Sequence, residues 1–265
     1  MKLAHITPIP LLHRILSKKD RFHLVLSSHI QSSDEYRTFY ADRMRAGDYV
    51  IMDSPAFELR DAVNWKEHFD MVKLFYPNEV VLPDDMESDK RTLKMTKDAA
   101  LRLREQGFKG SMMAVPHGKT IEAYLDNAID LCNVPGVSVL GIQEEVEELY
   151  GVDRPYVAEM LHYVVGIGTQ LHYLGFTEGL KELLPQARAH IRSADSGKIV
   201  TYGLCGLEAS PESAQRGLLP PYPGRAALGG RMKYFDYDTN SQELIDMARW
   251  NIAQWRELHE GATRV

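Results

Sequence analysis

Residues 49–54 read YVIMDS, residues 79–85 EVVLPDD, residues 111–118 SMMAVPHG and residues 191–197 IRSADSG. These four stretches decide the fold, because each is a short apolar run that ends in carboxylates or in a histidine followed by glycine. Buried strands with ionisable groups at their C-terminal ends are typical of the active site of an α/β-barrel. The pattern brings carboxylates that are distant in the chain into one pocket, and such groups catalyse glycosidic-bond chemistry.

Eight candidate strands can be recognised along the chain. Most are rich in Val, Ile, Leu or Met and are bounded by Gly, Pro, Asn or Asp. Their apolar residues are continuous, which is typical of strands buried on both faces of a parallel sheet. The strands are expected at residues 3–8, 23–28, 49–54, 79–84, 111–117, 137–142, 171–176 and 191–196.

Helical patterns lie between several of these strands, at residues 34–46, 89–106 and 120–131. Gly107 follows the second pattern, as glycine often follows a helix, and Thr120 can cap the third. The apolar face of the third helix is expected to comprise Ile121, Leu125, Ala128 and Leu131.

The alternation of strands and helices predicts the α/β class, and the length of 265 residues is close to that of one (β/α)8 barrel. A TIM-type barrel spanning residues 1–265 is preferred over a doubly wound sheet, because no GxGxxG follows the first strand. The Gly/Pro-rich segment 203–231 reads as a long loop over the barrel mouth. Residues 240–258 predict a C-terminal helix that closes the barrel through Ile245, Ala248, Ile252 and Trp255.

Composition and charge are those of an ordinary globular protein, with 44% hydrophobic and 26% charged residues. The net charge of −6 gives no global sign of nucleic-acid binding, but phosphate contacts need only a local basic patch. Cys132 and Cys205 lie in no CxxC or Cys/His cluster, which argues against a zinc site and suits a reducing cytosol. No apolar run approaches a membrane span, and the first residues are too interrupted for a signal peptide, so we expect a cytoplasmic protein.

The carboxylates at two of the strand ends are candidate catalytic or binding groups. Asp53 would lie partly desolvated at the barrel rim, where it could do acid–base work, or it could cap the following helix. Asp84 and Asp85 are adjacent and point to opposite sides in an extended chain, so we expect at most one of them to face the pocket. The pair is weak evidence for a metal, because no histidine at ligand spacing accompanies it.

Two further strand ends carry groups that could bind a planar ligand. His117 follows a proline and precedes Gly118, which would allow a ligand or a tight turn close by, and a structural role for His117 is equally open. Gly141 and Ile142 end the sixth strand before Gln143, so backbone and side-chain amides could be offered there. The other interpretation is a polar loop that leads into an acidic helix start.

The last strand carries Asp195 between small residues, which leaves room for a substrate beside the carboxylate. An Asp-Ser-Gly type I turn is the alternative, and spacing alone does not separate the two. Lys198 could hold a phosphate or screen Asp195. A basic cluster with aromatic neighbours could track a sugar-phosphate backbone and stack on bases, and it comprises Arg225, Arg231 and Lys233 with Tyr222, Tyr234 and Phe235.

The order of these strand ends resembles the tRNA-guanine transglycosylase superfamily, and most of all its shorter, zinc-less relatives that insert 7-deazaguanines into DNA. The resemblance covers roughly residues 23–200 and rests on IMDSPAFE, VVLPDD, AVPHG, VLGIQEE, LHYLGF and IRSADSG in this order. The sequence departs from the family pattern in DSPAF, where a DSGG-type element is usual, and in His117, where glutamine is usual. It also lacks the Cys/His zinc site of the tRNA enzymes, which favours a DNA substrate.

The resemblance implies base exchange through a covalent intermediate, without a metal or redox cofactor. Asp195 would attack C1′ of a deoxyguanosine and displace guanine, and Asp53 would move the proton at the base. A free 7-deazaguanine such as 7-cyano-7-deazaguanine would then enter, and the target nucleotide would leave the duplex to reach the site. The implied substrate-binding residues are Ser54, Asp84, Asp85, His117, Gly118, Gly141, Ile142 and Gln143.

Several alternatives remain open on the sequence alone. The barrel could act on tRNA, or it could hydrolyse an N-glycosidic or glycosidic bond with the same carboxylates. It could also be a catalytically silent binding subunit that partners an active paralogue. The oligomeric state is not predicted.

Overall fold

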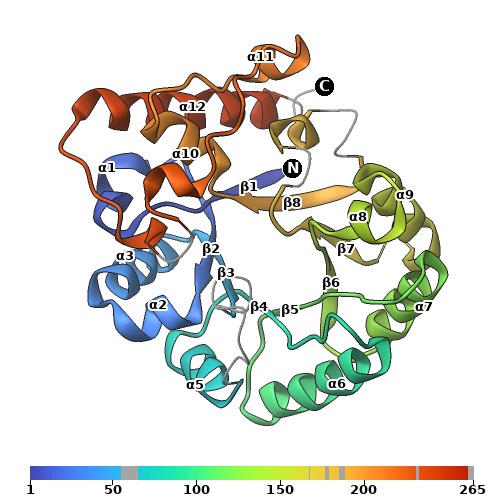
Figure 1. Cartoon of the computed structure of the whole chain (residues 1–265). Coiled ribbons are helices and arrows are strands. Elements are labelled where there is room, and N and C mark those ends of the chain that lie inside the picture. The colour runs from blue at the N-terminus through green and yellow to red at the C-terminus, as the bar shows by residue number, and fades with distance from the viewer. Residues whose placement is uncertain (55–64, 167, 177–178, 185–188, 231–232, 262–265) are drawn as a thin grey trace.

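The structure, a computed structural model, describes residues 1–54, 65–166, 168–176, 179–184, 189–230 and 233–261. Eight parallel strands form a nearly closed barrel with helices arranged around it, which confirms the expected (β/α)8 TIM-type fold (Figure 1). The strands are β1 (Lys2–His5), β2 (Phe22–Leu26), β3 (Tyr49–Asp53), β4 (Glu79–Val81), β5 (Ser111–Ala114), β6 (Val137–Ile142), β7 (Gln170–Tyr173) and β8 (Ile191–Ser196).

Each strand from β2 to β7 pairs with the next one along the chain, and β8 also pairs with β1. Among the described residues, only the seam between β1 and β2 has no hydrogen-bonded ladder. The register pairs Leu26 with Asp53 and Ala4 with Asp195, so both carboxylates lie at the C-terminal ends of their strands. All eight expected strands are confirmed, although several end earlier than the sequence suggested, because their last residues already belong to loops or to a helix.

Helices cover the outside of the barrel in the order expected for repeated strand–helix units (Figure 1). The α-helices are α1 (Leu12–Ile15), α2 (Ser27–Ser32), α3 (Asp34–Arg45), α5 (Trp65–Phe75), α6 (Asp89–Glu105), α7 (Ile121–Cys132), α8 (Val146–Tyr150), α9 (Arg154–Val165), α10 (Lys198–Leu204), α11 (Pro211–Gln215) and α12 (Gln242–Gly261). Short 3₁₀ helices are η1 (Ile9–Leu11), η2 (Gly179–Leu183), η4 (Arg225–Leu228) and η5 (Tyr234–Asp236).

The three helices expected between the strands are confirmed as α3, α6 and α7. The Thr120 side chain caps α7 by accepting from the Ala123 N–H. The buried face of α7 differs from the expected one. Ile121 and Leu125 are only half-buried, whereas Tyr124 and Asn127 are buried with Ala128 and Leu131. The sequence pattern missed this rotation because it counted only aliphatic residues, and Asn127 is buried through hydrogen bonds to His117 and Asp89.

The C-terminal helix α12, drawn in red in Figure 1, lies against α10 and beside β1. A Cβ atom at Gly203 of α10 would lie 2.3 Å from Cα of Ala248, so only glycine allows this close approach. The four residues expected to face the core are all buried, which confirms the expected packing of this helix. Segment 203–231 is not a continuous loop, because it contains α11 and η4, but its second half does lie over the barrel mouth.

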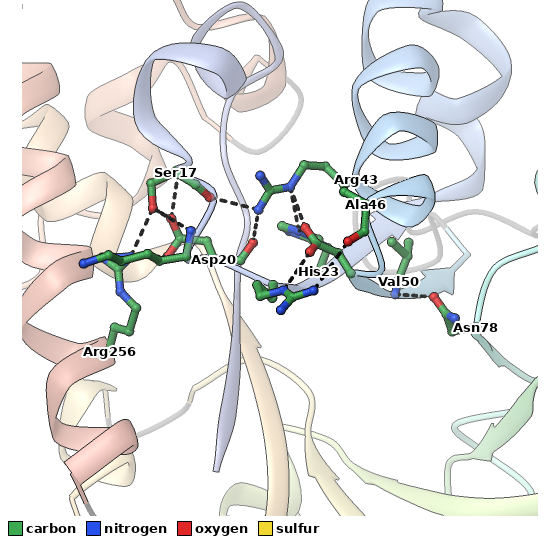
Figure 2. A network of polar contacts seen from close by, with 11 residues as sticks. Ser17, Asp20, His23, Arg43, Ala46, Val50, Asn78 and Arg256 are labelled. Carbon is green, nitrogen blue, oxygen red and sulfur yellow. Dashed lines mark hydrogen bonds and ion pairs between the residues drawn. The ribbon is translucent and has the colours of Figure 1, made fainter.

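A network of charged side chains lies at the N-terminal end of the barrel, opposite the cavity described below (Figure 2). Arg256 of α12 contacts Asp20, which precedes β2, at 3.2 Å. Asp48, which precedes β3, accepts from Arg43, Arg21 and His23 at 2.6 to 3.2 Å. Burial alone would raise the pKa of Asp48, but the hydrogen bonds from His23 and Arg21 and the charge of Arg43 lower it. The network therefore joins the last helix to the first strands, at the face of the barrel that serves stability.

Buried histidines make the fold sensitive to acid. His68 of α5 is 2% exposed, and its Nδ1 lies 3.0 Å from Oγ of Ser27. Burial lowers the pKa of His68 from 6.5 to about 4. Between these two pH values the unfolded chain binds a proton that the folded chain does not. The free energy of unfolding is therefore unaffected by His68 above pH 6.5 and falls as the pH drops toward 4.

We expect His68→Gln to make the stability of the protein less dependent on pH. Between neutral pH and about pH 5, protonation of His68 in the unfolded chain lowers the unfolding free energy of the wild type by about 2 kcal/mol. Glutamine does not titrate, so this part of the pH-dependent decrease should be absent from the variant. Urea titrations of both proteins at the two pH values measure the difference. An equal loss of stability in the variant and the wild type would show that His68 is not the responsible group.

We find no helix among the described residues with the length and apolar content that crossing a bilayer requires.

Candidate active site

A cavity of about 880 Å³ lies at the C-terminal ends of the barrel strands. This is where active sites of TIM barrels are found, and the volume is typical of a small-molecule site. Residues from many parts of the chain come together in its lining. Those at the strand ends are Asp53, Asp84, His117, Gln143, Gly175 and Asp195.

Asp195 is held in β8 by two donors to the same oxygen. Its Oδ1 atom accepts from Nε2 of His172 at 3.1 Å and from the backbone N–H of Gly175 at 3.4 Å. The side chain is 14% exposed, and it lines the cavity. Its other oxygen, Oδ2, accepts no hydrogen bond from any residue that the structure describes. The carboxylate is thus oriented through one oxygen and leaves the second for a ligand.

His172 is a functional candidate that the sequence did not reveal. It lies fully buried in β7, next to Ser193 of β8 in the register, and its Nδ1 atom is 2.8 Å from the Ser193 hydroxyl. Ser193 and Asp195 are two residues apart in one strand, so their side chains share a face of the sheet. The available signal was a histidine between Leu171 and Tyr173 in a buried strand, and its role can be inferred only when the neighbouring strand is known.

Arg154 is a second residue that the sequence did not reveal, and it fixes the loop that follows β7. It is fully buried at the start of α9 and pairs with the buried Glu182 at 2.9 Å. Its guanidinium also donates to the backbone carbonyls of Leu174 and Gly175 at 2.8 and 2.9 Å, and to that of Ile142. The Leu174 carbonyl and the Gly175 N–H belong to one peptide group, so Arg154 orients the amide that donates to Asp195.

A second polar group lies in the cavity around His117. Nε2 of His117 is 2.6 Å from Oδ2 of Asp84, and its Nδ1 is 3.4 Å from the amide nitrogen of Gln143. That amide also donates to the carbonyl of Pro116 at 3.1 Å. The Oε1 atom of Gln143 is buried and has no hydrogen-bond partner among the described residues. A buried carbonyl oxygen without a donor is costly, so it is a natural acceptor for a ligand N–H.

Asp85 also borders the cavity, but its contacts differ from those of Asp84. Its carboxylate pairs with Arg91 of α6 at 2.9 Å and accepts from the Glu87 N–H at 2.9 Å. Asp84 is therefore the one that contacts a cavity histidine, while Asp85 closes the turn before α6. In the described part of the chain, no three His, Cys, Asp or Glu side chains come together as possible metal ligands.

Asp53 ends β3, Ser54 follows it, and both line the cavity. Asp53 is half-buried, and its Oδ1 accepts from the backbone N–H of Ser54 at 2.7 Å. The rest of the DSPAF element, residues 55–57, lies outside the described residues.

Two of the four basic residues expected to bind nucleic acid line the cavity, namely Lys198 and Arg225. Lys198 donates to the carbonyl of Phe176 and lies 5.3 Å from the ring of Tyr222, which is also in the lining. Burial raises the pKa of Tyr222, so its hydroxyl stays protonated and can donate. Lys233 is exposed and does not line the cavity, and Arg231 lies outside the described residues.

Gly118, Gly141 and Ile142 do not line the cavity. A Cβ atom at Gly118 would lie 2.4 Å from the backbone nitrogen of Tyr124, so this glycine allows close packing on α7. A Cβ atom at Gly141 would lie 2.8 Å from the side chain of Leu174. Ile142 is fully buried. None of these three residues, all expected to bind substrate, borders the cavity, and the two glycines allow close packing of neighbouring elements.

A comparison of the chain with models of known protein families found no match, and a comparison with curated proteins also found none.

Proposed function

We propose that the chain is a transglycosylase that exchanges guanine in DNA for a 7-deazaguanine base such as 7-cyano-7-deazaguanine. The observation that carries the proposal is the set of carboxylates around one cavity, with Asp195 oriented through Oδ1 and open at Oδ2. Retaining enzymes of glycosidic chemistry use one carboxylate as nucleophile and another for proton transfer. The likeness of the strand ends to the transglycosylase superfamily supports the same assignment.

In the first half of the proposed reaction, Oδ2 of Asp195 attacks C1′ of the target deoxyguanosine. The bond between C1′ and N9 breaks, the electron pair leaves with guanine, and Asp53 supplies the proton that neutralises the departing base. In the second half, N9 of the incoming base attacks C1′, its proton passes to Asp53, and the ester bond to Asp195 breaks. The cycle consumes no oxidant and no water.

The second polar group gives the base a place to bind. A purine-like base presents a flat face with N–H donors and carbonyl acceptors on one edge. The Asp84 carboxylate and the Gln143 Oε1 atom accept from such donors, and the His117 ring lies between them. Lys198 and Arg225 add positive charge near Asp195, where the sugar-phosphate backbone would pass.

Nucleoside analysis tests the proposal directly. DNA is incubated with the protein and 7-cyano-7-deazaguanine, digested to nucleosides and analysed by mass spectrometry, with a parallel sample of tRNA. We expect the modified deoxynucleoside in DNA together with free guanine. Release of guanine without incorporation would show that the protein is a hydrolase and not a transferase. Modification of tRNA alone would show that the substrate is tRNA and not DNA. Binding of DNA without any release of guanine would indicate a silent binding subunit.

We expect Asp53→Ala to lower the exchange rate by about 10²–10⁴-fold, the usual contribution of a proton-transfer group. Binding of the free base should persist, because Asp84, His117 and Gln143 remain in place. Exchange of labelled guanine measures the first quantity, and calorimetry with the free base measures the second. An equal loss of base binding would make Asp53 a recognition residue.

A further inference from the structure

A continuous chain of polar contacts runs through the barrel interior to Asp195. It begins at Glu79 of β4, which is fully buried and accepts from both terminal nitrogens of Arg192, at 2.7 and 3.0 Å. The Arg192 Nε atom donates to Oγ of Ser193 at 2.9 Å. Ser193 Oγ is 2.8 Å from Nδ1 of His172, and Nε2 of His172 is 3.1 Å from Asp195. β4 lies opposite β8 in the barrel, so Arg192 spans the interior.

The chemistry of these groups determines which atom donates in each hydrogen bond of this series. Arginine has only donors, so the Ser193 oxygen must accept from Arg192. The hydroxyl proton of Ser193 is then donated to Nδ1 of His172, the only other group within hydrogen-bond range of that oxygen among the described residues. A neutral imidazole that accepts at Nδ1 carries its proton on Nε2. That proton points at Oδ1 of Asp195, an acceptor.

We propose that Arg192 and Ser193 hold His172 as the neutral tautomer protonated on Nε2, and that His172 is thereby a positioning residue for Asp195. This inference rests on the proposed function only in taking Asp195 as the nucleophile. A neutral donor orients the carboxylate without cancelling its charge. Together with the Gly175 amide, it occupies Oδ1, so that Oδ2 faces the anomeric carbon. At the other end of this series of contacts, the Glu79 carboxylate accepts from both terminal nitrogens of Arg192 and so fixes the orientation of the guanidinium.

The tautomer can be measured without a substrate. Long-range ¹H–¹⁵N spectra of protein labelled with ¹⁵N-histidine distinguish protonated from bare ring nitrogens, and the His172 signals are assigned by their loss in His172→Gln. At neutral pH we expect a bare Nδ1 and a protonated Nε2 in the wild type, and loss of this single state in Ser193→Ala. A wild-type ring protonated on Nδ1, or on both nitrogens, would overturn the inference.

Ser27→Ala is a matched control, because it removes a serine hydroxyl from the ring of another buried histidine, His68, and neither residue lines the cavity. We expect this variant to leave the His172 signals and the exchange rate unchanged. A change in the His172 signals of the control equal to that in Ser193→Ala would overturn the inference as well.

Kinetics separate positioning from a purely structural role. His172→Gln keeps an amide N–H that can donate to Asp195, whereas His172→Met keeps only the bulk. We expect His172→Met to lower kcat about a hundredfold with little change in KM, as for other misplaced reacting groups, and His172→Gln to recover much of this loss. Equal losses in the two variants would contradict the positioning role. If the wild type shows no exchange, the proposed function fails, while the spectra still decide the tautomer.

Discussion

Replacing Asp195 with asparagine should abolish covalent catalysis and leave the fold intact. Asparagine has nearly the shape of aspartate, and its oxygen can still accept from His172 and from the Gly175 amide. Its amide group is not a nucleophile at C1′, so no glycosyl ester can form. Loss of the nucleophile in enzymes with covalent intermediates typically costs about four orders of magnitude or more in kcat.

Two measurements check this expectation. Exchange of labelled guanine into DNA gives the rate, and intact-protein mass spectrometry or a denaturing gel detects the covalent adduct. We expect no adduct in Asp195→Asn and an unchanged unfolding transition. Asp98→Asn serves as the control, because it neutralises an exposed carboxylate that pairs with Lys94 on α6. An adduct that persists in Asp195→Asn would move the nucleophile to another carboxylate of the cavity.

The barrel could be predicted from the sequence because its signals are local. A parallel strand buried on both faces appears in the sequence as a continuous apolar run. The ends of the helices are marked by residues such as Thr120 at an N-terminus and Gly107 after a C-terminus. The four short runs that end in polar groups located the C-terminal face as well. Asp53, Asp84, His117 and Asp195 do line one cavity.

The remainder of the candidate site depends on which strands are neighbours, and the sequence does not contain that information in a local form. His172 has no distinguishing neighbours in its own strand, and its role depends on Ser193 and Asp195 of the adjacent one. Arg154 acts through backbone carbonyls, which carry no sequence signal at all. Gly118 and Gly141, which were expected to bind substrate, do not line the cavity and allow close packing. A glycine needed for close packing looks the same in a sequence as one needed for binding.

Arg154→Met should destabilise the protein more than any surface substitution and should also impair exchange. Methionine fills much of the volume but leaves the buried Glu182 carboxylate without its arginine, and removal of one partner of a buried ion pair costs about 3–5 kcal/mol. The carbonyls of Leu174 and Gly175 lose their donor at the same time. Since the 174–175 peptide group also donates to Asp195, the carboxylate loses one of its two orienting contacts.

Urea titration of four proteins, the wild type, Arg154→Met, Glu182→Met and the double variant, isolates the ion pair from the carbonyl contacts. We expect the double variant to be more stable than Arg154→Met, because it no longer buries a carboxylate that has lost its arginine. It should still be less stable than the wild type, because the carbonyls still lack the arginine donor. Arg216→Met is the control, since it breaks an exposed pair with Glu212 and should change stability little. If Arg154→Met unfolds at the same urea concentration as this control, the buried arginine does not hold the loop after β7, and the Gly175 amide must be fixed by other contacts.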